Sequence, residues 1–169
     1  INGDCGMSTL YTNNIRAAIG TQVSMANGHT LHAPGHVIQT QHMTYATNTT
    51  NSTVGSWVDS GLTLDITVGS GNKLYVTANI ASGQLYNATT MGLYQRLLVN
   101  DTEISNCHWE ENASGYKLRN HFILGFSSAL TAGTYTVKCQ TYVVLAGTYF
   151  RYNWTGIGQS WLVAQEIAQ

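Results

Sequence analysis

Charged side chains are scarce in this 169-residue chain. Lys and Arg total 7, Asp and Glu total 8, and together they make up 9% of the sequence. Proteins that bind nucleic acids draw most of their affinity from Lys and Arg side chains that neutralise phosphates. Seven scattered cations and a formal net charge of −1 do not supply such a surface. We therefore expect no nucleic-acid partner.

Long apolar runs and dense cysteines are also missing. No run approaches the roughly 20 apolar residues that a membrane-spanning helix needs, and nothing resembles a signal peptide, so we expect no membrane insertion. Cys5, Cys107 and Cys139 are too few and too widely spaced for a disulfide scaffold or a metal site. This pattern favours reduced thiols and assembly in a cytoplasm. Cys139 alternates with Tyr135 and Val137, which predicts a buried, small side chain.

The sequence lacks the residue patterns that common catalytic sites require. Glycoside hydrolysis needs two carboxyl groups that face one sugar, but Glu110 and Glu111 are adjacent and would point to opposite faces of a strand. Asp59 and Asp65 fall at turn or solvent-facing positions of the predicted strands. No Gly-x-Ser-x-Gly elbow and no glycine-rich phosphate loop is present. We expect no enzyme, no catalytic residue and no cofactor.

What the chain does have is typical of β-structure. Thr, Tyr, Trp and Val suit strands, while Asn and the 17 Gly suit turns. Alternation places Leu62, Leu64, Ile66 and Val68 on one face of a strand. Turn signals at short intervals separate eight or nine strands, which we expect at 36–45, 56–59, 62–68, 73–80, 93–104, 122–126, 134–144, 149–155 and 161–167. Residues 100–101 would turn the fifth of these, 122–126 would be buried, and the last strand would pair centrally or pack against a neighbouring subunit. A jelly-roll β-sandwich accommodates this number of strands.

Residues 1–36 differ from the rest of the chain. Their isolated hydrophobic residues are too few to close a core within one chain; they are Leu10, Ile15, Ile19, Val23, Met25 and Leu31. Such a segment is disordered or becomes ordered when copies wrap together. We expect residues 1–36 to form a short β-rich stalk or collar and residues 37–169 to form the head.

Four histidines cluster near the predicted junction of stalk and head: His29, His32, His36 and His42. In a threefold assembly, copies of one histidine meet near the axis, where imidazoles can bind zinc or iron. The spacing, however, lacks the tight alternation that puts two rings on one strand face. We therefore predict polar junction residues and no metal.

Several short phrases along the chain resemble a known family. These phrases are Ser8–Ile15, Pro34-Gly-His-Val-Ile-Gln39, Trp57-Val-Asp-Ser-Gly-Leu62, Gly71-Asn-Lys-Leu-Tyr-Val76, Arg96-Leu-Leu98 and Ile167-Ala-Gln169. Their order is similar to that in C-terminal head modules of phage and marine-virus fibres and other virion appendage proteins. The resemblance implies a homotrimer with a tumour-necrosis-factor-like jelly roll. It also implies that other virion proteins, of a tail or of a capsid, hold the chain through sequence N-terminal to Ile1, and that it is assembled in the host cytoplasm.

Two loops fall outside the resembling phrases, and recognition residues concentrate in loops of this kind. Trp109 and Tyr116 can stack on a sugar ring, while Arg119 and Asn120 can form hydrogen bonds to its hydroxyl groups. Tyr86 and Asn87 lie in the second loop. We predict that these six residues bind a host receptor, such as a cell-surface glycan. The alternative is that the loops only cover the end of the sandwich.

Two other functions stay open. One is a purely structural capsid decoration or fibre tip. The other is a secreted eukaryotic trimeric signalling or lectin-like head, which six N-glycosylation sequons would suit; these begin at Asn48, Asn51, Asn87, Asn100, Asn112 and Asn153. A chain rich in Asn and Thr produces such triplets by chance. In residues 149–154, alternation places Phe150, Tyr152 and Trp154 on one face of a strand and the other three residues on the opposite face. We expect one of these faces to join the core and the other to lie at a subunit interface.

Overall fold

The computed structural model describes residues 33–85, 91–111, 117–144, 149–153 and 158–169. Ala33–Gln169 form one compact unit, and the described part of it is built from strands, with no helix. No helix that could cross a membrane is therefore found in this part of the chain. The predicted stalk, apart from residues 33–36, lies outside the described residues, as do His29 and His32.

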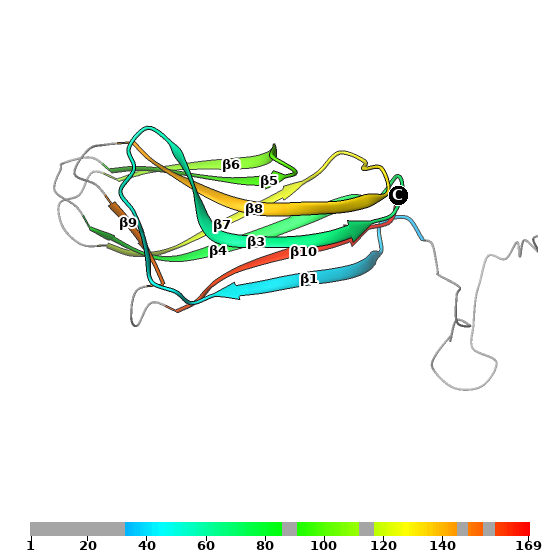
Figure 1. Ribbon diagram of the computed structural model, residues 1–169, viewed down its shortest axis with the longest axis horizontal. Helices are drawn as coiled ribbons and strands as arrows, with labels where there is room; N and C mark the ends of the chain where they lie inside the picture. The colour runs from blue at the N-terminus through cyan, green and yellow to red at the C-terminus, as the bar shows by residue number, and fades with distance from the viewer. Residues whose placement is uncertain (1–32, 86–90, 112–116, 145–148, 154–157) are drawn as a thin grey trace, which may run out of the picture. The chain divides into compact units, whose positions relative to one another are not determined.

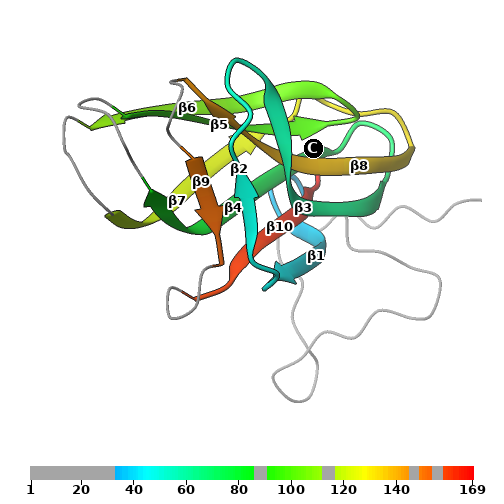
Figure 2. The ribbon, with the colours of Figure 1, turned by 60° about the vertical axis from the view of Figure 1, so that its left-hand side comes forward.

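The described residues form ten strands in two antiparallel sheets (Figures 1 and 2). The first sheet contains β1 (Val37–Tyr45), β10 (Ser160–Ile167), β4 (Lys73–Leu85), β7 (Lys117–Phe126), β9 (Tyr149–Tyr152) and β2 (Thr49–Asn51). The second contains β3 (Trp57–Val68), β8 (Gly133–Val143), β5 (Met91–Val99) and β6 (Thr102–Glu111).

The order of the long strands is that of a jelly roll. The sequence β1-β10-β4-β7 in the first sheet faces β3-β8-β5-β6 in the second. The predicted all-β jelly-roll sandwich is therefore confirmed. The last strand, β10, lies between β1 and β4, as Figure 1 shows, so the prediction of central pairing is also confirmed.

Alternation along the strands fills the core between the sheets. On β4, Leu74, Val76, Ala78 and Ile80 are buried, and Phe150 and Tyr152 of β9 lie with them. Cys139 of β8 is fully buried, as predicted, and this burial raises the pKa of its thiol to about 12. Trp154 lies outside the described residues.

The predicted division between residues 56–59 and residues 62–68 was wrong. The segments 56–59 and 62–68 are one strand, β3, whose register against β8 shifts between Asp59 and Thr63. Gly61 lies in this bulge with a φ of 86°, a conformation that glycine adopts without strain. The predicted break at residues 100–101 is real: Asn100 and Asp101 both have positive φ and turn β5 into β6.

The prediction that residues 122–126 are buried was wrong. Ile123 and Gly125 of β7 point into the sandwich, whereas Phe122, Leu124 and Phe126 are 53%, 46% and 58% exposed. Strand geometry forces this result, because neighbouring side chains point to opposite faces of a sheet. An apolar run in a strand is fully buried only when both faces are covered.

Candidate functional site

The central part of the outer face of the first sheet is uncharged and half apolar, and Lys73 lies at the next outward position of β4 beyond it. The register of the four strands places twelve side chains on it in three rows: Thr44, Trp161, Asn79 and Phe122; His42, Val163, Thr77 and Leu124; and Thr40, Gln165, Tyr75 and Phe126. We call this set the apolar face. None of its twelve residues is Asp, Glu, Lys or Arg.

Contacts between aromatic rings order the side chains of the apolar face. The rings of Tyr75 and Phe126 have centroids 4.7 Å apart, and those of Phe122 and Trp161 are 6.0 Å apart. Tyr75 and Phe126 lie on the neighbouring strands β4 and β7, while β4 separates the strands of Phe122 and Trp161. Both distances are within the range of favourable ring contacts. The face is thus ordered by its own side chains and still leaves three large apolar residues of β7 open.

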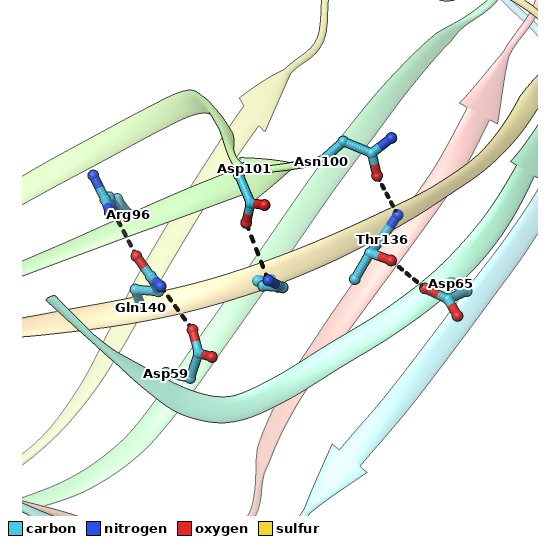
Figure 3. Close-up of polar contacts among 8 residues, drawn as sticks. Asp59, Asp65, Arg96, Asn100, Asp101, Thr136 and Gln140 are labelled. Carbon is cyan, nitrogen blue, oxygen red and sulfur yellow. Dashed lines mark hydrogen bonds and ion pairs between the residues drawn. The ribbon is translucent and has the colours of Figure 1, made fainter.

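The outer face of the second sheet is chemically different. Arg96 Nε donates to Gln140 Oε1 at 2.8 Å, and Gln140 Nε2 donates to Asp59 Oδ1 at 2.7 Å. Thr136 Oγ1 donates to Asp65 Oδ1 at 2.7 Å, as Figure 3 shows. These hydrogen bonds connect β5, β8 and β3 across the sheet and are accessible to water.

Two ion pairs complete this polar surface. Lys138 Nζ lies 3.0 Å from Asp101 Oδ1, and this hydrogen bond and the negative charge raise the pKa of Lys138. Arg96 lies 3.4 Å from Glu103. Exposed pairs of this kind contribute little to stability. The surface is suited to solvent, in contrast to the apolar face.

The structure describes three of the six predicted receptor-binding residues. Tyr86, Asn87 and Tyr116 lie outside the described residues. Trp109 is on β6 of the second sheet, with its backbone opposite Leu93, whereas Arg119 and Asn120 are on β7 of the first sheet, opposite Ser82 and Ala81. Asn120 is exposed. The described residues therefore do not bring Trp109 and Asn120 together on one sheet.

Sequence reasoning missed the apolar face. Its clearest signal was the alternation of Phe122, Leu124 and Phe126 with Ile123 and Gly125, which gives β7 large apolar residues on both sides. The predicted histidine cluster gives no metal site in the described part of the chain: no group of three His, Cys, Asp or Glu residues lies close enough there. His36 instead contacts the backbone of Ala33 through Nδ1.

Two of the six sequon asparagines are part of the core. Asn51 is 2% exposed and donates through Nδ2 to Thr141 Oγ1 at 3.1 Å. Asn153 is 7% exposed, donates to the carbonyl oxygen of Thr47 at 3.1 Å and accepts from the Ser160 backbone at 2.8 Å. A sugar attached to either amide nitrogen has no room in this fold.

Comparison with known proteins gives little. No family model matches the chain, and no curated protein matches it. Among solved structures the chain is similar to dimeric latent PorU from Porphyromonas gingivalis, at 11% sequence identity over 88% of this chain, with a TM-score of 0.39. The chain spans 14% of the PorU chain. A similarity this weak supports no inference about function.

Proposed function

We propose that this chain is the homotrimeric head of a virion appendage, which attaches the particle to a host receptor. The apolar face carries the proposal, because a face with three large, half-exposed apolar residues and no charge is suited to burial against protein. Full burial of one such side chain is worth about 1.5–3 kcal/mol. Exposed apolar patches of this kind mark interaction sites.

Neighbouring copies of this chain are the partners that fit the apolar face best, each packing part of its face against a different part of the next copy. The twelve positions carry no charge, so a partner that buries them must also present an uncharged, apolar surface. Another copy of this chain offers that surface, and closed symmetric assemblies of identical chains are the common form of soluble oligomers. The number three comes from the resemblance to virus fibre heads.

Attachment follows from the arrangement of such an assembly. Copies that meet through the apolar face leave the polar outer face of the second sheet toward solvent. Several weak contacts then add up through multivalency, which raises the overall affinity without any new contact. In such an assembly, tail or capsid proteins would hold the head on the particle.

The two alternatives differ from this function in testable ways. A structural decoration needs the same oligomer and binds no receptor. A secreted, glycosylated head relies on the sequons, and two of their six asparagines, Asn51 and Asn153, are engaged within the core. The buried asparagines favour the view that these two triplets serve the fold.

Sedimentation equilibrium on the full chain tests the oligomer. We expect the mass of three chains of 18.4 kDa each. Leu124→Lys places a charge in the middle of the apolar face and should reduce the mass to that of one chain, because an unpaired charge is costly to bury. Thr134→Lys, at an exposed position of the second sheet, should leave the mass unchanged.

A single-chain mass for the unchanged protein would contradict the proposal. The appendage role has its own test: antibodies raised against the full chain should label projections on virus particles in immunoelectron microscopy. Particles that bind the antibody and lose adsorption to host cells would separate attachment from pure decoration.

A further inference from the structure

Four aromatic side chains form a continuous row across the outer face of the second sheet. Trp57 on β3 pairs with Tyr142 on β8, Tyr142 pairs with Tyr94 on β5, and Tyr94 pairs with His108 on β6. Strands lie about 4.8 Å apart, so the row extends about 14 Å across the sheet. We call these four residues the aromatic row.

The rings of the aromatic row support one another. Tyr94 and His108 stack with centroids 3.9 Å apart and planes 6° from parallel, and Tyr142 meets Tyr94 edge-on at 5.7 Å. Trp57 lies 5.4 Å from Tyr142. Ring geometry fixed in this way reduces the entropy that binding would cost.

A cavity opens onto these rings. It has a volume of about 300 Å³ and is lined by Trp57, Tyr94, Tyr142 and Val144. This value is at the lower end of the range of about 300–1,000 Å³ for ligand pockets, which suits one small ring better than an extended chain. All four lining residues are only partly buried, so the cavity is reached from solvent.

A row of polar side chains runs directly beside the aromatic row. Asp59, Gln140, Arg96 and Asn106 occupy the next outward positions on the same four strands. Arg96 links the two rows: its guanidinium carbon lies 4.3 Å from the centre of the Trp57 ring, and its Nε donates to Gln140. Figure 3 shows the chain of contacts from Arg96 through Gln140 to Asp59.

This combination matches the chemistry of a pyranose sugar. One face of the sugar ring carries C–H groups and packs on an aromatic ring, while its hydroxyl groups both donate and accept hydrogen bonds. Asp59 accepts, Arg96 donates, and the amides of Gln140 and Asn106 do both. An apolar wall with a few fixed polar groups is the usual composition of a small-molecule site.

The charges at the site argue for a neutral sugar. Arg96 is the cation closest to the aromatic row among the described polar partners, and it already faces Glu103 at 3.4 Å and is linked through Gln140 to Asp59. An anionic ligand would have to compete with these two carboxylates. The same balance disfavours nucleic acid, whose affinity depends on uncompensated cations.

We propose that the aromatic row and the cavity beside it bind a neutral pyranose of a glycan. The inference rests on the proposed attachment function and gives it a site, on the four strands of the second sheet and opposite the apolar face. Recognition would thus use the rigid sheet surface, where register fixes the side chains.

Oligosaccharide titration of the full-length chain tests the site. The panel contains lactose, maltotriose, chitobiose and mannobiose, with 3′-sialyllactose as the acidic member, each at millimolar concentration. We expect at least one neutral sugar to bind and to shift the indole N–H resonance of Trp57 in NMR spectra. Trp57→Phe identifies that resonance.

Three variants locate the binding. Tyr94→Ala and Trp57→Ala should weaken the affinity by about tenfold or more, as truncation of a central aromatic contact usually does. Thr67→Ala, on the same outer face and outside the two rows, should leave the affinity unchanged. Circular dichroism and sedimentation check that each variant keeps its fold and mass. If a variant does not fold, the shift of the Trp57 resonance in the unchanged protein still tests whether sugar binds at the site.

The outcomes are distinct. Absence of sugar binding, a Trp57 resonance that does not move, or binding of 3′-sialyllactose alone would overturn the site. Loss of the oligomer in Tyr94→Ala would also overturn it, since the row would then be an interface. A trimer that binds no sugar refutes the site and leaves the oligomer, whereas a single chain that binds sugar refutes the oligomer and leaves the site.

Discussion

At the scale of single residues, Glu166 is a carboxylate buried in the described part of the fold. It is 3% exposed, and its oxygens accept from Gln39 Nε2, the backbone N–H of Gly69 and Asn72 Nδ2, each at 2.7 Å. Burial alone would raise the pKa of Glu166, but these three hydrogen bonds favour the charged form and together hold the pKa below its ordinary value. The carboxylate ties the β3–β4 turn to β10 and β1.

Glu166 should therefore make the stability depend on acid pH. A lowered folded-state pKa contributes stability above the unfolded value of about 4.3, and this contribution is lost as the pH falls through the folded value. Glu166→Gln removes the charge and replaces one accepting oxygen by an amide N–H₂ group, which cannot accept a hydrogen bond from the donors that face it. We expect a loss of about 1.5–3 kcal/mol at neutral pH and a flatter acid limb in urea unfolding experiments.

Asp65→Asn is the control for this prediction. Asp65 also accepts a hydrogen bond, from Thr136, but its side chain is exposed on the outer face of the second sheet. It should change the stability little at any pH. Equal losses in the two variants, or an unchanged acid limb in Glu166→Gln, would show that the Glu166 network does not stabilise the fold.

At the scale of elements, the bulge in β3 depends on Gly61. A Cβ atom on Gly61 would lie 2.6 Å from Cζ of Tyr45, and the φ of Gly61 is positive. Gly61→Ala should thus combine a steric clash with backbone strain and lower the free energy of unfolding by about 1–3 kcal/mol or more. Chemical denaturation followed by circular dichroism measures this loss.

Gly71→Ala separates the two causes. Gly71 has a similar positive φ of 84°, but nothing lies within 4 Å of a Cβ placed there. It should cost only the backbone term, about 1–2 kcal/mol. If Gly61→Ala is no more destabilising than Gly71→Ala, the packing of Tyr45 against the bulge has no energetic importance.

The sequence predicted strands and turns correctly where the residue pattern that specifies them lies within a single segment. The alternation in β4 and β3 and the turn residues Asn100 and Asp101 identified strands and a hairpin. The bulge at Gly61 was missed because a glycine within a strand pattern also fits a turn between two strands. For β7, apolarity of Phe122 and its neighbours indicated burial, but sequence does not state whether a second layer covers the outer face.

Site prediction was limited by the distance between partners along the chain. The predicted recognition residues were chosen because Trp109 and Tyr116 are close in sequence, and Tyr116 lies outside the described residues. Trp57, Tyr94 and Tyr142 are separated by some tens of positions, and only strand register aligns them. A pattern that exists between strands carries no signal within any one of them.

At the scale of the whole molecule, the two outer faces of the sandwich differ in the charged side chains that they present. The first sheet presents the apolar face without charge, while the second presents Asp59, Asp65, Arg96 and Lys138 in connected hydrogen bonds. A surface meant for solvent on both sides would distribute charges over both sheets. Under the proposed function, one side would serve association and the other would serve recognition.

Association through the apolar face also predicts how the protein melts. When folded chains associate and unfolded chains do not, the midpoint of thermal unfolding rises with chain concentration. We expect this rise for the unchanged protein in scanning calorimetry, and for Thr134→Lys. Leu124→Lys should melt at a lower temperature that is the same at every concentration. A concentration-independent midpoint for the unchanged protein would mean that the sandwich is stable alone, and that the exposed Phe122, Leu124 and Phe126 serve a partner other than a second copy.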